Sequence, residues 1–156
     1  MLIVFKLGVD PSTDFRGMGV FALHQLVHFV TNRPTQARAV LLVSNHPRRF
    51  FPFAVAGINI SAFIVSLLVE TRMHTFLCKT CLQGNSILDN NFSYSSGPSD
   101  SQYLVDKACN TLNELYCRIF IEFAELWELR DPPTVMQFNE IFTEIQNKIR
   151  IEFQPI

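Results

Sequence analysis

The sequence predicts an all-α fold, a single helical domain of about five to six helices with one long polar surface loop. Three observations lead to this prediction. Apolar residues recur at spacings of three and four in several segments, Pro- and Asn-containing breaks separate these segments, and no convincing strand pattern or internal repeat occurs. The chain has 156 residues, 48% of them hydrophobic, and includes 15 phenylalanines, which is enough to bury a substantial core.

The first third of the chain predicts two helices. Asp10-Pro11 suits the start of a helical turn, with Asp as the cap and Pro at the first helical position. From about residue 15 to the break at residues 32–34 we expect an amphipathic helix, and a shorter one follows over 35–43 until Asn45-His46-Pro47. The apolar stripe expected to face the core in the first helix consists of Val20, Leu23, Val27 and Val30.

A segment without charge follows, from Phe50 to Val69. Its length alone would suit a membrane span. Pro52, Gly57 and Asn59 dilute its hydrophobicity, however, and a helix at the centre of a core also lacks charge. We therefore predict a buried core helix from Pro52 to about residue 72, then a further helix over 76–82, and no integral membrane insertion.

The second half predicts a loop and two more helices. Residues 83–101 are rich in Gly, Ser and Asn and predict a flexible surface loop within the domain. Asp131-Pro132-Pro133 ends the next helix, and Thr134 with Gln137 has the spacing of a capping box for the last one. The expected core stripes are Leu104, Ala108, Leu112, Leu115, Ile119, Phe123 and Leu126 in the first of these helices, and Phe138, Ile141, Phe142, Ile145 and Ile149 in the second.

Charge and cysteine usage bound the class of protein. A formal net charge of −1 provides no general attraction for nucleic acid or anionic lipid, so we expect no nucleic-acid partner. No secretory signal precedes the cysteines, so we expect a cytoplasmic protein with reduced thiols. Cys78 and Cys81 could form half of a zinc site or a redox pair, but Cys109 and Cys117 lie about 80° apart on a helix and supply no second pair of ligands. Small apolar side chains are the better interpretation of all four.

Signatures of common enzyme classes do not occur. His24 and His28 have the spacing of metal ligands, but Gln25 stands where a zinc peptidase needs a glutamate, so we predict no metal site. Neither a P-loop, nor a dinucleotide-binding glycine pattern after a strand, nor a nucleophile elbow is present. The sequence therefore predicts no cofactor bound by the chain itself.

Arg16 is the candidate functional residue. An arginine beside Asp14 is usually only a surface ion pair. Gly17 and Gly19 each lower helix stability by about 1 kcal/mol relative to alanine, which suggests that another backbone or a partner approaches closely. Free backbone N–H groups at a helix start favour an anion, and the planar guanidinium suits a phosphate.

Three stretches carry a resemblance to a known family. The most specific is Asp10-Pro11-Ser12-Thr13-Asp14-Phe15-Arg16-Gly17-Met18-Gly19. The second begins at Pro52-Phe53-Ala54-Val55-Ala56-Gly57, and the third runs from Glu114 through Trp127 to Asn139. In this order they resemble the ELMO domain family, which is helical.

The resemblance implies a GTPase-activating protein for small GTPases of the Arf and Arf-like family, a regulator of an enzyme rather than an enzyme. Arg16 would enter the partner's nucleotide site as an arginine finger, Asp14 could orient its guanidinium, and the glycines would let the two backbones approach. GTP and magnesium would belong to the GTPase, and peripheral membrane association is compatible with such a partner. The alternative is a non-catalytic scaffold of the engulfment type, acting with a Dock-type exchange factor in Rac and cytoskeletal signalling.

The chain departs from the family pattern upstream of the motif. Family members carry a tryptophan and a Gly-Phe-Gln-Gly run there, whereas this chain has Phe5-Lys6-Leu7-Gly8. We therefore interpret residues 1–156 as an ELMO domain that is incomplete at its N-terminus.

Overall fold

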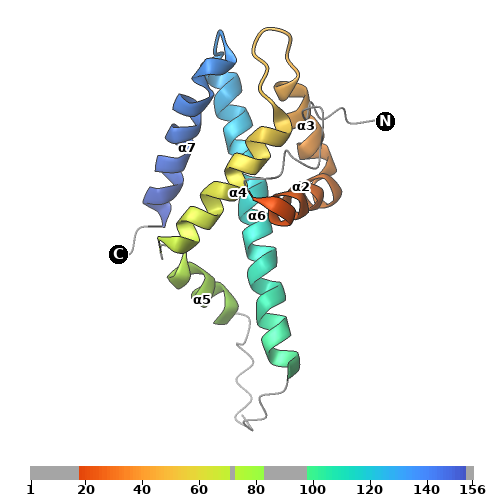
Figure 1. Cartoon of the computed structure of the whole chain (residues 1–156), viewed down its shortest axis with the longest axis vertical. Helices are drawn as coiled ribbons and strands as arrows, with labels where there is room; N and C mark the ends of the chain where they lie inside the picture. The colour runs from red at the N-terminus through yellow and green to blue at the C-terminus, as the bar shows by residue number, and fades with distance from the viewer. Residues whose placement is uncertain (1–17, 71–72, 83–97, 154–156) are drawn as a thin grey trace.

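The computed structural model describes residues 18–70, 73–82 and 98–153, and it is helical throughout these ranges without any strand (Figure 1). The predicted all-α fold is therefore confirmed. The elements follow in the order α2 (Gly19–Asn32), α3 (Pro34–Ser44), α4 (Phe53–Val69), α5 (His74–Leu82), α6 (Pro98–Arg130), the short 3-10 helix η2 (Val135–Gln137) and α7 (Phe138–Glu152).

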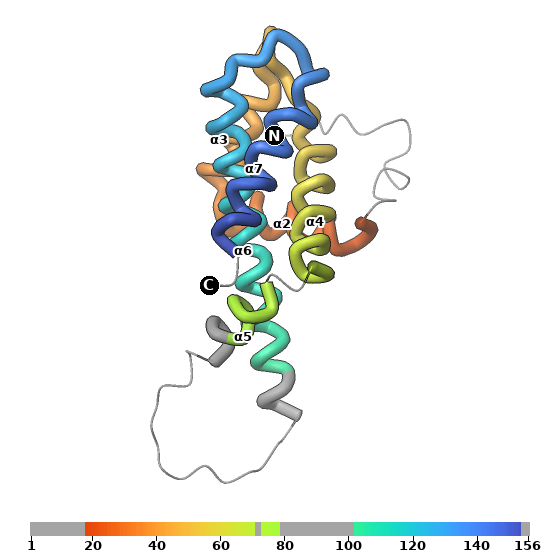
Figure 2. Tube along the Cα trace, turned by 90° about the vertical axis from the view of Figure 1, so that its left-hand side faces the viewer, coloured from red at the N-terminus to blue at the C-terminus, as the bar shows by residue number. Residues whose placement is uncertain are grey.

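The 33-residue helix α6 forms the axis of the molecule. Helices α2, α3, α4, α5 and α7 all pack against it. In Figure 2 the C-terminal part of α6 lies inside the bundle, whereas its N-terminal part extends below the other helices with only α5 alongside. This explains why the stripe predicted on α6 is buried at Leu115, Ile119 and Phe123 but 41% exposed at Leu104.

Aromatic rings fill the space between α6 and its neighbours. Phe123 lies at the centre, with ring centroids 5.1 Å from Phe51 and 5.2 Å from Phe138, both in edge-to-face geometry. Phe53 stacks on Phe120 at 4.8 Å. The quadrupoles of the rings favour such edge-to-face and offset arrangements. The phenylalanine-rich composition thus corresponds to one continuous core, as expected.

Helix α4 occupies the position predicted for the uncharged segment. Nine of its 17 residues are buried, among them Ile60, Phe63 and Ile64. No helix in the ranges described combines the length and the hydrophobicity that a membrane crossing requires. The prediction of a buried core helix is confirmed.

Two predicted boundaries in the second half are wrong. Helix α6 already begins at Pro98, so residues 98–101 are helical rather than part of the predicted loop. Proline suits the first helical position because its ring presets the backbone angle. The rest of the predicted loop, residues 83–97, lies outside the described part. The capping box does not form either. Thr134 makes no side-chain cap, since its carbonyl oxygen accepts the Gln137 N–H (3.4 Å) and η2 precedes α7.

Candidate functional site

The motif with Arg16 lies directly before α2. Met18 and Gly19 are the members that the structure describes; the other members, among them Asp10, Pro11, Thr13, Asp14, Phe15, Arg16 and Gly17, lie outside the described residues. Gly19 has φ +55°, a left-handed conformation that glycine adopts without strain. A Cβ at this position would meet no atom within 4 Å. Glycine is thus needed here for its backbone conformation, and the described chain makes no close approach to it.

The N-terminus of α2 has no side-chain cap. Met18 is the N-cap and its side chain makes no capping hydrogen bond, and the first turn contains no acidic residue. A helix therefore begins three residues after Arg16, close to where the sequence predicted a helix start. Its first backbone N–H groups have no intrahelical partners, and the positive end of the helix dipole adds to their preference for an anion.

Helix α2 is rotated relative to the sequence prediction. Ala22, Gln25, Leu26 and Phe29 are its buried residues. Of the residues predicted to face the core, Val20, Leu23 and Val27 are exposed by 81%, 43% and 51%, whereas Val30 is partly buried and packs against the core. The helix carries two apolar stripes, and the one with Phe29 faces the core because its ring packs on Phe120 (5.3 Å) and Tyr116 (6.3 Å) of α6.

The exposed stripe is the feature that sequence analysis missed. Residues 19–32 contain no Asp, Glu, Lys or Arg, so the solvent side of α2 has no charge. A surface helix normally carries charges there, as α7 does with Glu140, Glu144 and Lys148. The lack of charge and the second stripe were both visible in the sequence and could have indicated the exposed apolar face.

Close packing against α4 and α6 fixes α2 in this rotation. Gly57 of α4 lies where a Cβ would collide with the Leu26 side chain and the Tyr116 hydroxyl. Beside it, Ser61 Oγ donates a hydrogen bond to Gln25 Oε1 (2.7 Å), and both residues are fully buried. Burial also raises the pKa of Tyr116 well above its ordinary value, so its hydroxyl stays neutral.

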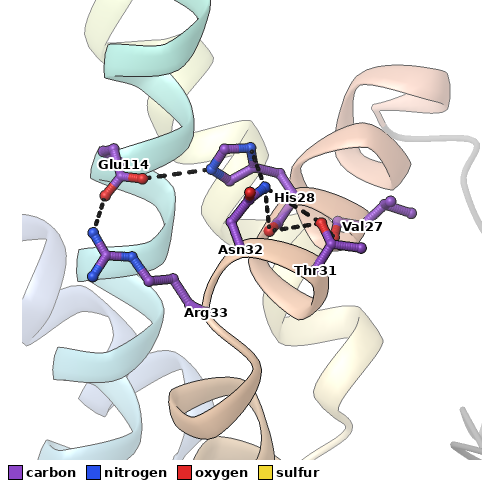
Figure 3. Close-up of polar contacts among 6 residues, drawn as sticks. All are labelled: Val27, His28, Thr31, Asn32, Arg33 and Glu114. Carbon is purple, nitrogen blue, oxygen red and sulfur yellow. Dashed lines mark hydrogen bonds and ion pairs between the residues drawn. The ribbon is translucent and has the colours of Figure 1, made fainter.

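Polar side chains connect the end of α2 to α6 (Figure 3). Arg33 Nη2 lies 2.6 Å from one carboxylate oxygen of Glu114, and His28 Nε2 lies 3.6 Å from the other. Asn32 Nδ2 lies 3.1 Å from His28 Nδ1 on the opposite side of the ring. The His28 ring therefore faces Glu114 of α6. His24 is exposed on α2 and does not join His28 in a group that could bind a metal ion. Across the described ranges, no three His, Cys, Asp or Glu side chains gather as a metal site would require.

Among the described residues, the cysteines form neither a disulfide nor a metal-ligand cluster. Cys117 is buried, and burial together with the nearby Glu114 carboxylate raises the pKa of its thiol to about 11, so it is a poor nucleophile. Cys78 and Cys109 are free and exposed. The side chain of Cys81 lies outside the described residues, and the interpretation of Cys78 and Cys81 stays a prediction.

Comparison with known proteins identifies relatives of the whole helical unit. Residues 7–142 match the ELMO/CED-12 family, a range that includes the Arg16 motif and α2 to η2. ELMO domain-containing protein B of Dictyostelium discoideum is 32% identical over 142 residues, covering 91% of this chain and 41% of that protein. ELMO domain-containing protein 2 of Mus musculus is 28% identical, covering 92% and 41%, and ELMO domain-containing protein 1 of Homo sapiens is 26% identical, covering 94% and 45%.

The chain thus spans less than half the length of these relatives. No solved structure matches significantly. The family match covers most of the chain, and all three resembling stretches fall within the matched range. This chain belongs to the ELMO/CED-12 family.

Proposed function

We infer that the protein is a GTPase-activating protein for a small GTPase of the Arf or Arf-like family and that Arg16 is its arginine finger. The observation that carries this inference is the position of Arg16 within a family motif, three residues before the uncapped N-terminus of α2. A guanidinium in this position has the planar donors that phosphate oxygens accept.

The mechanism is charge stabilisation in trans. Negative charge spreads over the γ-phosphoryl oxygens as the bond to the leaving phosphate breaks, and the Arg16 guanidinium donates hydrogen bonds to these oxygens. An arginine finger supplied by a partner raises the rate by about 10³–10⁵-fold in characterised systems. The GTPase holds GTP and magnesium, and this chain supplies the arginine and the helix that follows it in the sequence.

Single-turnover GTP hydrolysis by a panel of Arf-family GTPases tests the proposal. The wild-type chain should accelerate hydrolysis by at least one of them. Arg16→Lys should lower this stimulation by roughly 10³-fold, because lysine keeps the charge but lacks the planar fork. Arg38→Lys is the matched control, since Arg38 is an exposed arginine on α3, and it should stimulate like the wild type.

The same assay distinguishes a GTPase activator from the non-catalytic scaffold. A chain that binds a GTPase without accelerating hydrolysis, in the wild type as in Arg16→Lys, would act as a non-catalytic interaction module. Stimulation that Arg16→Lys leaves unchanged would rule out the finger role while keeping the activator class.

A further inference from the structure

The exposed stripe of α2 begins four positions after the proposed finger in the sequence. Val20, Leu23 and Val27 fall within an arc of about 60° of the helix, and they extend over about 10 Å along it. The buried residues Ala22, Leu26 and Phe29 lie on the opposite side, so packing inside the described bundle does not use the stripe. The two sides of α2 therefore have separate roles.

The chemistry of the stripe is that of an interface centre. Contiguous apolar surface without charge is unusual on a soluble domain and marks binding sites, whose centres are depleted in charged residues. Of the other exposed side chains on this face, His24 and Thr31 carry no formal charge as long as the histidine is neutral, and the Thr31 hydroxyl is used by the Val27 carbonyl of its own helix (2.8 Å). The matching surface on a partner must accordingly be apolar.

Chain connectivity identifies the partner. Val20 lies four positions after Arg16, and even a fully extended chain places their Cα atoms within about 14 Å of each other. A globular partner that receives Arg16 in its nucleotide site has a diameter well above this distance, about 30 Å or more for a small domain. Such a partner reaches the first turns of α2, which lie at the edge of the bundle in Figure 2.

We propose that Val20, Leu23 and Val27 form the docking surface for the same GTPase that receives Arg16. This proposal rests on the function proposed above and assigns different roles to Arg16 and to the stripe. Arg16 stabilises the transition state, whereas the α2 stripe supplies affinity. The surface that the GTPase presents to the stripe is apolar and adjoins its nucleotide site.

The test separates affinity from rate in the single-turnover assay. The double variant Leu23→Gln/Val27→Gln should raise the concentration of this protein that gives half-maximal stimulation by roughly tenfold or more and leave the maximal rate unchanged. Arg16→Lys should do the reverse and lower the maximal rate. The control variants Leu42→Gln and Leu129→Gln change leucines that are exposed by 70% and 78% on other helices, and they should match the wild type.

Each other outcome overturns the proposal for an identifiable reason. An unchanged half-maximal concentration, with stimulation still lost in Arg16→Lys, would contradict docking but keep the proposed function. No stimulation by the wild type across the panel would overturn both. A melting temperature several degrees lower in the double variant, with normal controls, would indicate that the chain's own residues cover the stripe. Loss of a dimer in sedimentation, with unchanged stimulation, would assign the stripe to a second copy.

Discussion

Gly57 shows how one missing side chain positions α2. Helix α4 approaches Leu26 of α2 and Tyr116 of α6 so closely at this residue that a methyl group would overlap both. Both neighbours are buried, so neither can move into solvent. The rotation of α2, and with it the exposure of the Val20 side, depends on this contact.

We expect Gly57→Ala to destabilise the fold. Alanine favours the helix by about 1 kcal/mol, but overpacking of a filled core costs about 1–3 kcal/mol, and the two helices held by Gly57 would have to separate. Denaturant unfolding measures the net change.

The Tyr116→Phe background provides the control for Gly57→Ala. The Tyr116 hydroxyl has no hydrogen-bonding partner among the described residues, so its removal alone should be neutral or stabilising. The cost of Gly57→Ala should then be smaller in this background, because one of the two collisions disappears. Equal costs in both backgrounds would show that the hydroxyl contact does not matter.

At the scale of elements, the segment between α3 and α4 is attached to the end of α6. Arg49 lies 2.6 Å from Asp131 and 3.0 Å from Glu128, and Trp127 Nε1 donates to the Arg49 carbonyl oxygen (2.8 Å). Asp131 itself ends α6 with φ 44°, a left-handed conformation that aspartate tolerates better than most residues. The predicted helix stop at residues 131–133 is thereby confirmed.

The Arg49–Asp131 pair predicts acid sensitivity. The hydrogen bond from Arg49 lowers the pKa of Asp131 below its ordinary value of 3.8. A lowered folded-state pKa contributes stability above the unfolded-state pKa, and this contribution is lost as the pH falls through the folded-state pKa. The stability difference between wild type and Asp131→Asn should therefore be constant above about pH 5 and shrink in stronger acid.

Unfolding curves across this pH range measure the difference, and Arg49→Met should reproduce the effect from the other partner. Parallel curves for wild type and Asp131→Asn down to the lowest pH would show that the pair does not contribute.

The positions of helices could be predicted from the sequence where neighbouring residues along the chain determine them. Breaks with proline and asparagine bounded α3 and marked the start of α4, and the stripe from Phe138 to Ile149 on α7 is buried as predicted. Helix α4 ends at Val69, where no such break occurs, rather than near residue 72. The face of α2 could not be chosen locally, since two apolar stripes compete and only the aromatic packing of Phe29 on α6 decides between them. The capping box failed for a similar reason, because a backbone acceptor replaced the Thr134 side chain.

At the scale of the whole molecule, stability resides in the aromatic centre around α6. Phe123 contacts rings from the segment before α4 and from α7, and it is fully buried. The ion pair between Arg130 of α6 and Glu144 of α7 is about half exposed and contributes little. The fold class was predictable because composition and helical periodicity agree over most of the chain.

Phe123→Ala should lower the free energy of unfolding by about 3–5 kcal/mol, since it removes the ring that joins three elements and leaves a cavity. Arg130→Met, which breaks an exposed pair, should change it only slightly. Chemical denaturation of both variants checks this contrast. Comparable losses would mean that surface pairs carry more of the stability than the core geometry indicates.

The main proposal for this ELMO-family chain is the activation of a small GTPase through Arg16. Its most direct test is the maximal rate of single-turnover GTP hydrolysis by a responsive Arf-family GTPase, measured with saturating wild type and with saturating Arg16→Lys. We expect this rate to fall by roughly 10³-fold in the variant while the half-maximal concentration stays near that of the wild type. Equal maximal rates for the two proteins would contradict it.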